Sequence, residues 1–172
     1  IYCIRNQQHG GLLIKQNLRT CHILVIILSA KTDFKEQLEG LQVGADDYIP
    51  KPFSLVMITT KIRNLFRTRH RAIEYYSKSL EIEPEKIALN PLDEDLLKKA
   101  VEIMEKHMDD AEFTTDEFAR EMCMSRSNLH LKMKALTGES TNEFIRKVRF
   151  NYACKLLKDG KYTVSEISSM VG

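Results

Sequence analysis

The sequence of 172 residues lacks the features that mark membrane-spanning, metal-binding and secreted proteins. Its longest apolar run, Ile23 to Leu28, is far shorter than the roughly 18 apolar residues of a membrane-spanning helix. No basic and apolar leader follows Ile1. The four cysteines never form a CxxC pair and the five histidines are scattered, so we expect no metal site. These absences favour a reduced, cytoplasmic setting without membrane contact from this segment.

Acidic residues are missing from the start of the chain, where none precedes Asp33. The net charge is +5 over residues 1–70, −7 over residues 71–120 and +4 over residues 121–172. A basic carboxyl-terminal third fits contact with nucleic-acid phosphates, although a modest excess is usually only a solvated face. The sequence also contains no recognisable nucleophile–base pair or phosphate-binding loop, so we do not expect an enzyme.

Residues 113–138 are predicted to form two short helices joined by a tight turn. Thr114 and Glu117 have the spacing of a capping box, in which each residue satisfies a backbone N–H of the other. Ser125 is suited to cap the second helix, and Gly138 is suited to end it.

The second of these helices has two different faces. Leu129, Met133 and Leu136 recur at i, i+4 and i+7 and form one apolar stripe. A helix held by that stripe would present polar and basic groups outward, which suits insertion into a DNA major groove. An ordinary helical hairpin with a solvated outer face is the alternative. The residues expected to contact DNA are Arg126, Ser127, Asn128, His130, Lys132 and Lys134.

The same capping spacing recurs 49 residues later, where Thr163 and Glu166 repeat the pattern of Thr114 and Glu117. One longer helix, with a capping box of its own, is predicted over residues 140–158. Two helix-turn-helix units bridged by a helix resemble the AraC-type DNA-binding domain. The residues that carry the resemblance are Ser125, Leu129, Met133, Lys134, Gly138, Phe144, Arg149, Ala153, Leu156, Leu157, Ile167, Val171 and Gly172.

The amino-terminal part alternates between strand and helix patterns. Residues 23–28 form a continuous apolar run typical of a strand buried on both faces. A helix over residues 32–44, a short strand at 48–49 and a helix from Ser54 are expected to follow. This order predicts part of a doubly wound, parallel α/β sheet. The apolar residues expected to face its core are Phe34, Leu38, Leu41, Leu55, Ile58, Ile62 and Leu65.

Residues 25–31 and 40–53 resemble the carboxyl-terminal half of a response-regulator receiver domain. The resemblance implies that the Ser29 hydroxyl and the Lys51 ammonium hold an aspartyl phosphate, while Tyr48 swings inward. In that family the phosphate-accepting Asp and the acidic Mg²⁺ ligands lie upstream, yet residues 1–32 contain no carboxylate. The chain is therefore expected to hold no phosphoacceptor and no cofactor, with Mg²⁺ expected only for an intact receiver.

A basic cluster at Arg67 to Arg71 is expected at the end of a helix, where cations favour the helix dipole. A nucleic-acid patch is the alternative interpretation of this cluster.

The expected organisation is a receiver half at residues 1–70, a linker at 71–92 and an AraC-type domain at 93–172. The fold is thus an α/β receiver remnant followed by an all-α domain with two helix-turn-helix units, the second incomplete. We expect the chain to be a fragment, because it does not begin with Met and does not finish its second motif.

These patterns predict a sequence-specific transcription regulator of a bacterial two-component phosphorelay. Its expected partners are promoter DNA, a histidine kinase on the same or a separate chain, and a second copy when full length. The alternative is a protein-docking signalling module without DNA contact. The acidic middle of the chain favours that alternative slightly, as does Leu131 on the outer face, where many AraC-type domains carry Arg.

Overall fold

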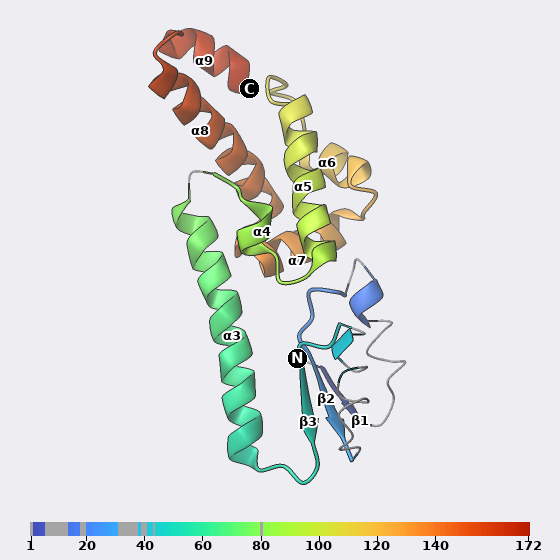
Figure 1. The fold of residues 1–172 in the computed structure, drawn as a ribbon. Helices are drawn as coiled ribbons and strands as arrows, with labels where there is room; N and C mark the ends of the chain where they lie inside the picture. Colours follow the sequence, from blue (N-terminus) through green and yellow to red (C-terminus); the bar gives the residue numbers. More distant parts are fainter. Residues whose placement is uncertain are drawn as a thin grey trace. The chain divides into compact units, whose positions relative to one another are not determined.

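The computed structural model describes residues 2–5, 14–17, 20–30, 38, 41–42, 44–79 and 81–172. The chain divides into two compact units. The first comprises residues 1–72 and 89–93, and the second comprises residues 73–88 and 94–172. Helix α3, Leu55–Lys78, begins in the first unit and ends in the second (Figure 1).

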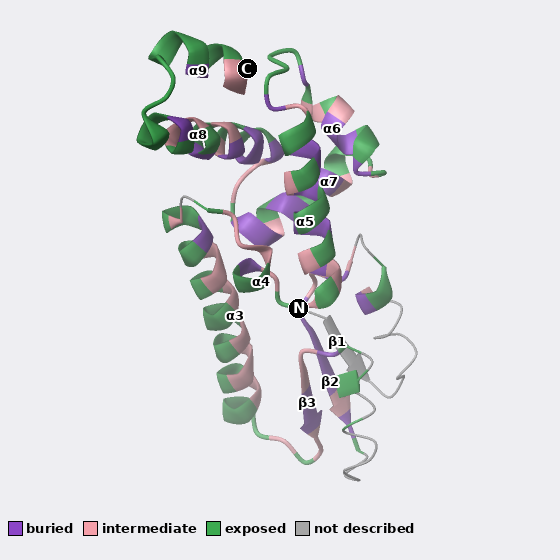
Figure 2. Ribbon diagram, turned by 45° about the horizontal axis from the view of Figure 1, so that its top comes forward, coloured by how far each residue is buried: buried purple, intermediate pink, exposed green. Residues whose placement is uncertain are grey.

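The first unit contains a parallel sheet of three strands in the order β1-β2-β3 (Figure 1). These are β1 at Tyr2–Arg5, β2 at Val25–Ser29 and β3 at Asp47–Pro50. Strand β2 is the central strand and is buried over most of its length, as its apolar run predicts (Figure 2). The parallel sheet is confirmed, and β1 is an addition that the sequence analysis does not predict.

Two expectations for the helices of this unit are wrong. Leu38 and Leu41 are 44% and 45% exposed, and Leu55 is 79% exposed because it lies in the first turn of α3. Phe34 and much of the helix expected at 32–44 lie outside the described residues. The other predicted stripe residues of α3, Ile58, Ile62 and Leu65, are half-buried, so they meet the expectation of a core stripe only in part.

The basic cluster Arg67 to Arg71 lies inside α3, so the prediction that it ends a helix is wrong. No Gly or Pro follows it before Lys78, and an ion pair of 2.6 Å between Glu74 and Lys78 supports the last turns. Tyr76, fully buried within the second unit, holds the end of the helix in place.

The described part of the second unit consists of helices joined by short loops and contains no strand. Apart from the end of α3, its helices are α4 (Pro84–Ile87), α5 (Pro91–Lys106), α6 (Thr115–Glu121), α7 (Arg126–Thr137), α8 (Thr141–Asp159) and α9 (Val164–Val171). The apolar faces of these helices, apart from α9, share one core, in which Leu97, Phe118, Leu129, Met133 and Phe144 are fully buried. This arrangement confirms the predicted helix-turn-helix region.

Within the described part of the chain, none of the helices combines the length and the apolar character that crossing a bilayer requires.

Candidate nucleic-acid interface

Three helices of the second unit begin with the reciprocal cap that the sequence predicts. At α6 the Thr114 N–H donates to the Glu117 carboxylate at 2.8 Å, and the Glu117 N–H donates to the Thr114 hydroxyl at 3.2 Å. Because the carboxylate accepts that backbone N–H, the pKa of Glu117 lies below its ordinary value. The same box starts α8 and α9, through Ser140 with Glu143 and Thr163 with Glu166.

A tight turn sets the direction of α7 relative to α6. Cys123 adopts φ of 55°, a left-handed conformation that bends the chain sharply. The Met124 N–H returns to the Ala119 carbonyl at 2.9 Å. The Ser125 hydroxyl then accepts the Asn128 N–H at 3.3 Å and caps α7, as predicted.

One face of α7 holds it in the core. Leu129, Met133 and Leu136 are all buried, which confirms the predicted apolar stripe. Their core also contains the Phe118 and Phe144 rings, which stack with centroids 6.1 Å apart. The opposite face of α7 is therefore free to meet a ligand.

The outer face carries most of the predicted contact residues. Arg126, Ser127 and Lys134 are exposed, and Asn128 and His130 are half-buried. A guanidinium, a hydroxyl, an amide, an imidazole and an ammonium on one helix can together contact phosphate oxygens and base edges.

Lys132 does not belong to this face, and its prediction as a flanking DNA contact is wrong. Its side chain is 0% exposed. Lys132 lies three residues after Leu129 and four before Leu136, so helical spacing places it on the buried side. Its aliphatic stem can line the core as an apolar chain.

A hollow of about 440 Å³ adjoins the outer face of α7. Its lining residues are Thr115, Arg126, Ser127, His130, Leu131, Ser140, Thr141 and Asn142. The contributions from the starts of α6 and α8 were not predicted, although the capping boxes at Thr114 and Ser140 mark both positions. The hollow thus combines the outer face of α7 with the first residues of two neighbouring helices.

Arg126 also lies near an acid. Its guanidinium is 3.3 Å from the Asp116 carboxylate, and the two side chains are 69% and 59% exposed. An exposed pair of this kind contributes only about 0–1 kcal/mol, so a phosphate can compete for the guanidinium.

The joint between α7 and α8 is fixed by the last turns of α3. Gly138 ends α7 with φ of 79°, and a Cβ there would lie 2.7 Å from the Cγ2 of Ile73. The Tyr76 hydroxyl donates to the Glu139 carboxylate at 2.9 Å, and the Lys147 ammonium lies 3.7 Å from the Tyr76 ring centroid. Burial first, and the Glu139 charge second, raise the pKa of Tyr76.

The sequence analysis places Tyr76 in a linker and misses this joint. Its partners lie more than sixty residues away, beyond the reach of local pattern.

Two of the three predicted receiver residues, Ser29 and Lys51, lie at the carboxyl ends of β2 and β3, whereas Tyr48 is the second residue of β3. Ser29 and Tyr48 are buried, and Lys51 is half-buried. The Lys51 backbone N–H donates to the Ser29 carbonyl at 2.7 Å, so the two residues adjoin at neighbouring strand ends. Tyr48 sits opposite Ile27 in the strand register. The carboxyl edge of a parallel sheet, where Ser29 and Lys51 meet, is a common position for ligand sites.

Two carboxylates at the start of β3 already have cationic partners. Asp46 lies 2.5 Å from the Lys15 ammonium, and Asp47 lies 2.6 Å from that of Lys61. Among the residues that the structure describes, no three His, Cys, Asp or Glu side chains gather closely enough to hold a metal ion.

The capped helix pair with an exposed outer face defines a helix-turn-helix domain, and comparison with known families agrees. Residues 118–172 match the family described as a helix-turn-helix domain. Histidine kinase P4 of Formosa agariphila is 38% identical over 159 residues, which cover 92% of this chain and 12% of that protein. Transcriptional regulatory protein QseB of Haemophilus influenzae is 27% identical over 168 residues, or 94% of this chain and 72% of that protein.

A third relative, transcriptional regulatory protein RprY of Bacteroides fragilis, is 36% identical over 69 residues, which cover 39% of this chain and 29% of RprY. The chain thus spans only a small part of the histidine kinase that it resembles. No solved structure matches the chain significantly. The matched domain and these relatives confirm the predicted resemblance to a helix-turn-helix regulator joined to a receiver.

Proposed function

We propose that the chain is the output part of a bacterial two-component system, and that its second unit binds promoter DNA to regulate transcription. The observation that carries the proposal is α7, which is anchored by one apolar face and exposes Arg126, Ser127 and Lys134 on the other. The helix-turn-helix match and the regulator names among the relatives support it. Such a protein would act in the cytoplasm.

The side chains of α7 are suited to different parts of a DNA site. Arg126 lies in the first turn, where backbone N–H groups and a guanidinium can bind one phosphate. Lys134, two turns further on, supplies a second phosphate contact. Ser127 and His130 can reach base edges, where a good contact gives about 1–3 kcal/mol of discrimination. Asn128 is proposed to flank these contacts, and α9 would begin a second unit of the same kind.

The first unit is proposed to be the carboxyl-terminal half of a receiver. Ser29 and Lys51 adjoin at the strand ends and would hold a phosphoryl group, while Tyr48 would respond to it. A histidine kinase would be the partner and Mg²⁺ the cofactor of the intact receiver. Because residues 1–32 hold no carboxylate, the accepting Asp would not come from that stretch.

A salt titration of fluorescence anisotropy tests the DNA proposal, with a labelled promoter fragment and an unrelated duplex of equal length. Lys134→Ala should weaken binding to both duplexes and reduce the salt slope by about one, because one phosphate contact is lost. Ser127→Ala should instead reduce the difference between the two duplexes. Lys106→Ala is the matched control, since Lys106 is an exposed lysine in the last turn of α5.

Two outcomes would contradict the proposal. One is the absence of binding to either duplex at low salt, where non-specific affinities of about 10⁻⁴–10⁻⁶ M or tighter are expected. The other is an equal change of slope in Lys134→Ala and Lys106→Ala. Either result would favour a protein-docking role. Leu131, which is 60% exposed on the outer face, would then be the first residue to test as a contact with a partner protein.

A further inference from the structure

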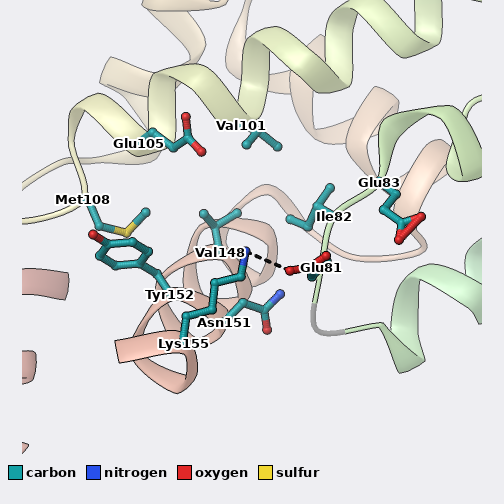
Figure 3. A pocket seen from close by; sticks show the side chains of 10 residues that line it. All are labelled: Glu81, Ile82, Glu83, Val101, Glu105, Met108, Val148, Asn151, Tyr152 and Lys155. Atoms are coloured by element: carbon teal, nitrogen blue, oxygen red, sulfur yellow. Dashed lines mark ion pairs between the residues drawn. The ribbon is translucent and has the colours of Figure 1, made fainter. Parts of the chain in front are cut away.

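A second hollow lies in the second unit, away from the residues proposed to contact DNA. It has a volume of about 200 Å³ and opens between α5, α8 and the segment that precedes α4 (Figure 3). Its apolar lining comes from Ile82, Val101, Met108, Val148 and the ring of Tyr152. This volume is below the roughly 300–1,000 Å³ of pockets for drug-sized ligands, so it suits a smaller molecule.

The polar lining of the hollow is mostly acidic. Glu81, Glu83 and Glu105 border it, against a single ammonium from Lys155. Glu81 pairs with Lys155 at 3.1 Å, and Glu83 pairs with Lys86. Glu105, on α5, is exposed and has no ion-pair partner among the described residues, so its carboxylate can attract a cation into the hollow (Figure 3).

Asn151 supplies a hydrogen-bond donor from the opposite side. Its side chain, on α8, is 7% exposed, and its Nδ2 has no hydrogen-bond partner in the described part of the chain. A buried donor without a partner destabilises the fold, so a ligand acceptor placed there would recover stability. The hollow therefore has a carboxylate on its α5 side, an amide donor on its α8 side and apolar side chains between them (Figure 3).

We propose that this hollow binds a small primary amine with an apolar body and a hydrogen-bond acceptor at its far end. The ammonium would pair with Glu105, the body would contact Val101, Val148 and the Tyr152 ring, and the acceptor would take the Asn151 amide. Because α8 connects α7 and α9 along the chain, occupation of the hollow would stabilise the helix that joins the proposed reading helix α7 to α9, the first helix of the proposed second helix-turn-helix.

Isothermal calorimetry on the full chain tests the proposal with tyramine, which has an ammonium, an aromatic body and a hydroxyl. Tyramine should bind with Kd below about 1 mM. The analogues 4-ethylphenol, which lacks the ammonium, and phenethylamine, which lacks the hydroxyl, should each bind more weakly. Glu105→Gln should lower tyramine affinity about threefold to fivefold, as expected for one exposed charge pair, and should leave 4-ethylphenol unchanged.

Glu102→Gln is the matched control, because Glu102 is an exposed acid on α5 that does not line the hollow. Asn151→Leu should remove the advantage of tyramine over phenethylamine, with circular dichroism confirming that the variant is folded. Equal binding of tyramine and 4-ethylphenol, or equal losses in the two Glu variants, would overturn the proposal. Binding of N-acetyl-lysine amide but not of tyramine would also overturn it, by assigning the hollow to the lysine of a partner protein.

Discussion

The described residues of the two units differ in the size of the apolar core that they form. In the second unit, buried residues from α5, α6, α7 and α8 form one continuous core that includes three phenylalanine rings. Among the described residues of the first unit, the core cluster consists of Val25, Ile27, Ala45 and Tyr48, with Ile14 packed against it. The exposed face of α3 carries further apolar side chains, with Val56 at 75% and Phe66 at 53% exposure.

The difference has an energetic consequence. Burial of apolar surface is the main stabilising term in folding, at roughly 25 cal/mol per Å². A unit with a shared core and capped helices should resist opening, while a small sheet with exposed apolar residues should open more readily. Exposed apolar surface can also mark a contact surface, and the exposed side chains of Val56 and Phe66 are described residues of α3 that a partner could cover.

Removal of one ring from the shared core should have the largest effect. Phe118 is fully buried between Phe113, at a centroid distance of 6.2 Å, and Phe144. Phe118→Ala should destabilise the second unit by about 3–5 kcal/mol, because it leaves a cavity. Hydrogen exchange should show loss of protection in α6–α8 with little change in β2 and β3.

Phe66→Ala is the matched control, since Phe66 is 53% exposed and its truncation removes little buried surface. An equal loss of protection in both variants would mean that the core of the second unit contributes no more to its stability than the exposed face of α3 does. Slower exchange in β2 and β3 than in α6–α8 of the unaltered chain would likewise contradict the comparison.

A smaller effect is expected at the joint between α7 and α8. Gly138 and Gly160 both end helices in the left-handed conformation, so alanine is strained at each position by about 1 kcal/mol. At Gly138 the new Cβ would also meet Ile73 at 2.7 Å, whereas nothing lies within 4 Å at Gly160. Gly138→Ala should therefore cost roughly 1–3 kcal/mol more than Gly160→Ala in urea unfolding.

Equal costs at the two glycines would show that Ile73 moves aside freely. The end of α3 would then pack only loosely against the joint between α7 and α8.

Local features of the second unit could be predicted from the sequence. A capping box involves two residues three positions apart, and a helix stripe repeats every three or four residues, so short stretches contain the whole signal. Thr114, Ser125 and Gly138 therefore do what their types and positions predict. The prediction for Lys132 is wrong because its helical position puts it on the buried side of α7, and a charged end group does not by itself place a side chain on the surface.

Contacts between distant residues could not be predicted in this way. Strand β1 is four residues long and acquires its identity only from pairing with β2. Tyr76 is fixed by Glu139 and Lys147, and without that contact its segment resembles a charged linker. The hollow beside α7 needed the starts of α6 and α8 to be brought together in space.

The smallest expected effect is the pH dependence that the capping glutamates give to the stability of the second unit. The carboxylates of Glu117, Glu143 and Glu166 each accept a backbone N–H, which lowers their pKa from the ordinary value of 4.5. A carboxylate whose pKa is lower in the folded state contributes stability above its unfolded pKa, and this contribution is lost as the pH falls through the folded pKa. The second unit should therefore weaken as the pH is lowered below about 4.5.

The triple variant Glu117→Gln, Glu143→Gln and Glu166→Gln isolates this contribution. A glutamine can still accept the backbone N–H but carries no charge, so the urea midpoint of the second unit should fall at pH 7 and depend less on pH between 7 and 3. Helix α3 of the first unit has no acid in its first turn, so protection of the first unit should respond equally in the variant and the unaltered chain. Glu102→Gln, in the middle of α5, controls for the loss of a negative charge elsewhere. If the triple variant keeps the full pH dependence of the unaltered chain, the capping carboxylates do not set the acid response of the second unit.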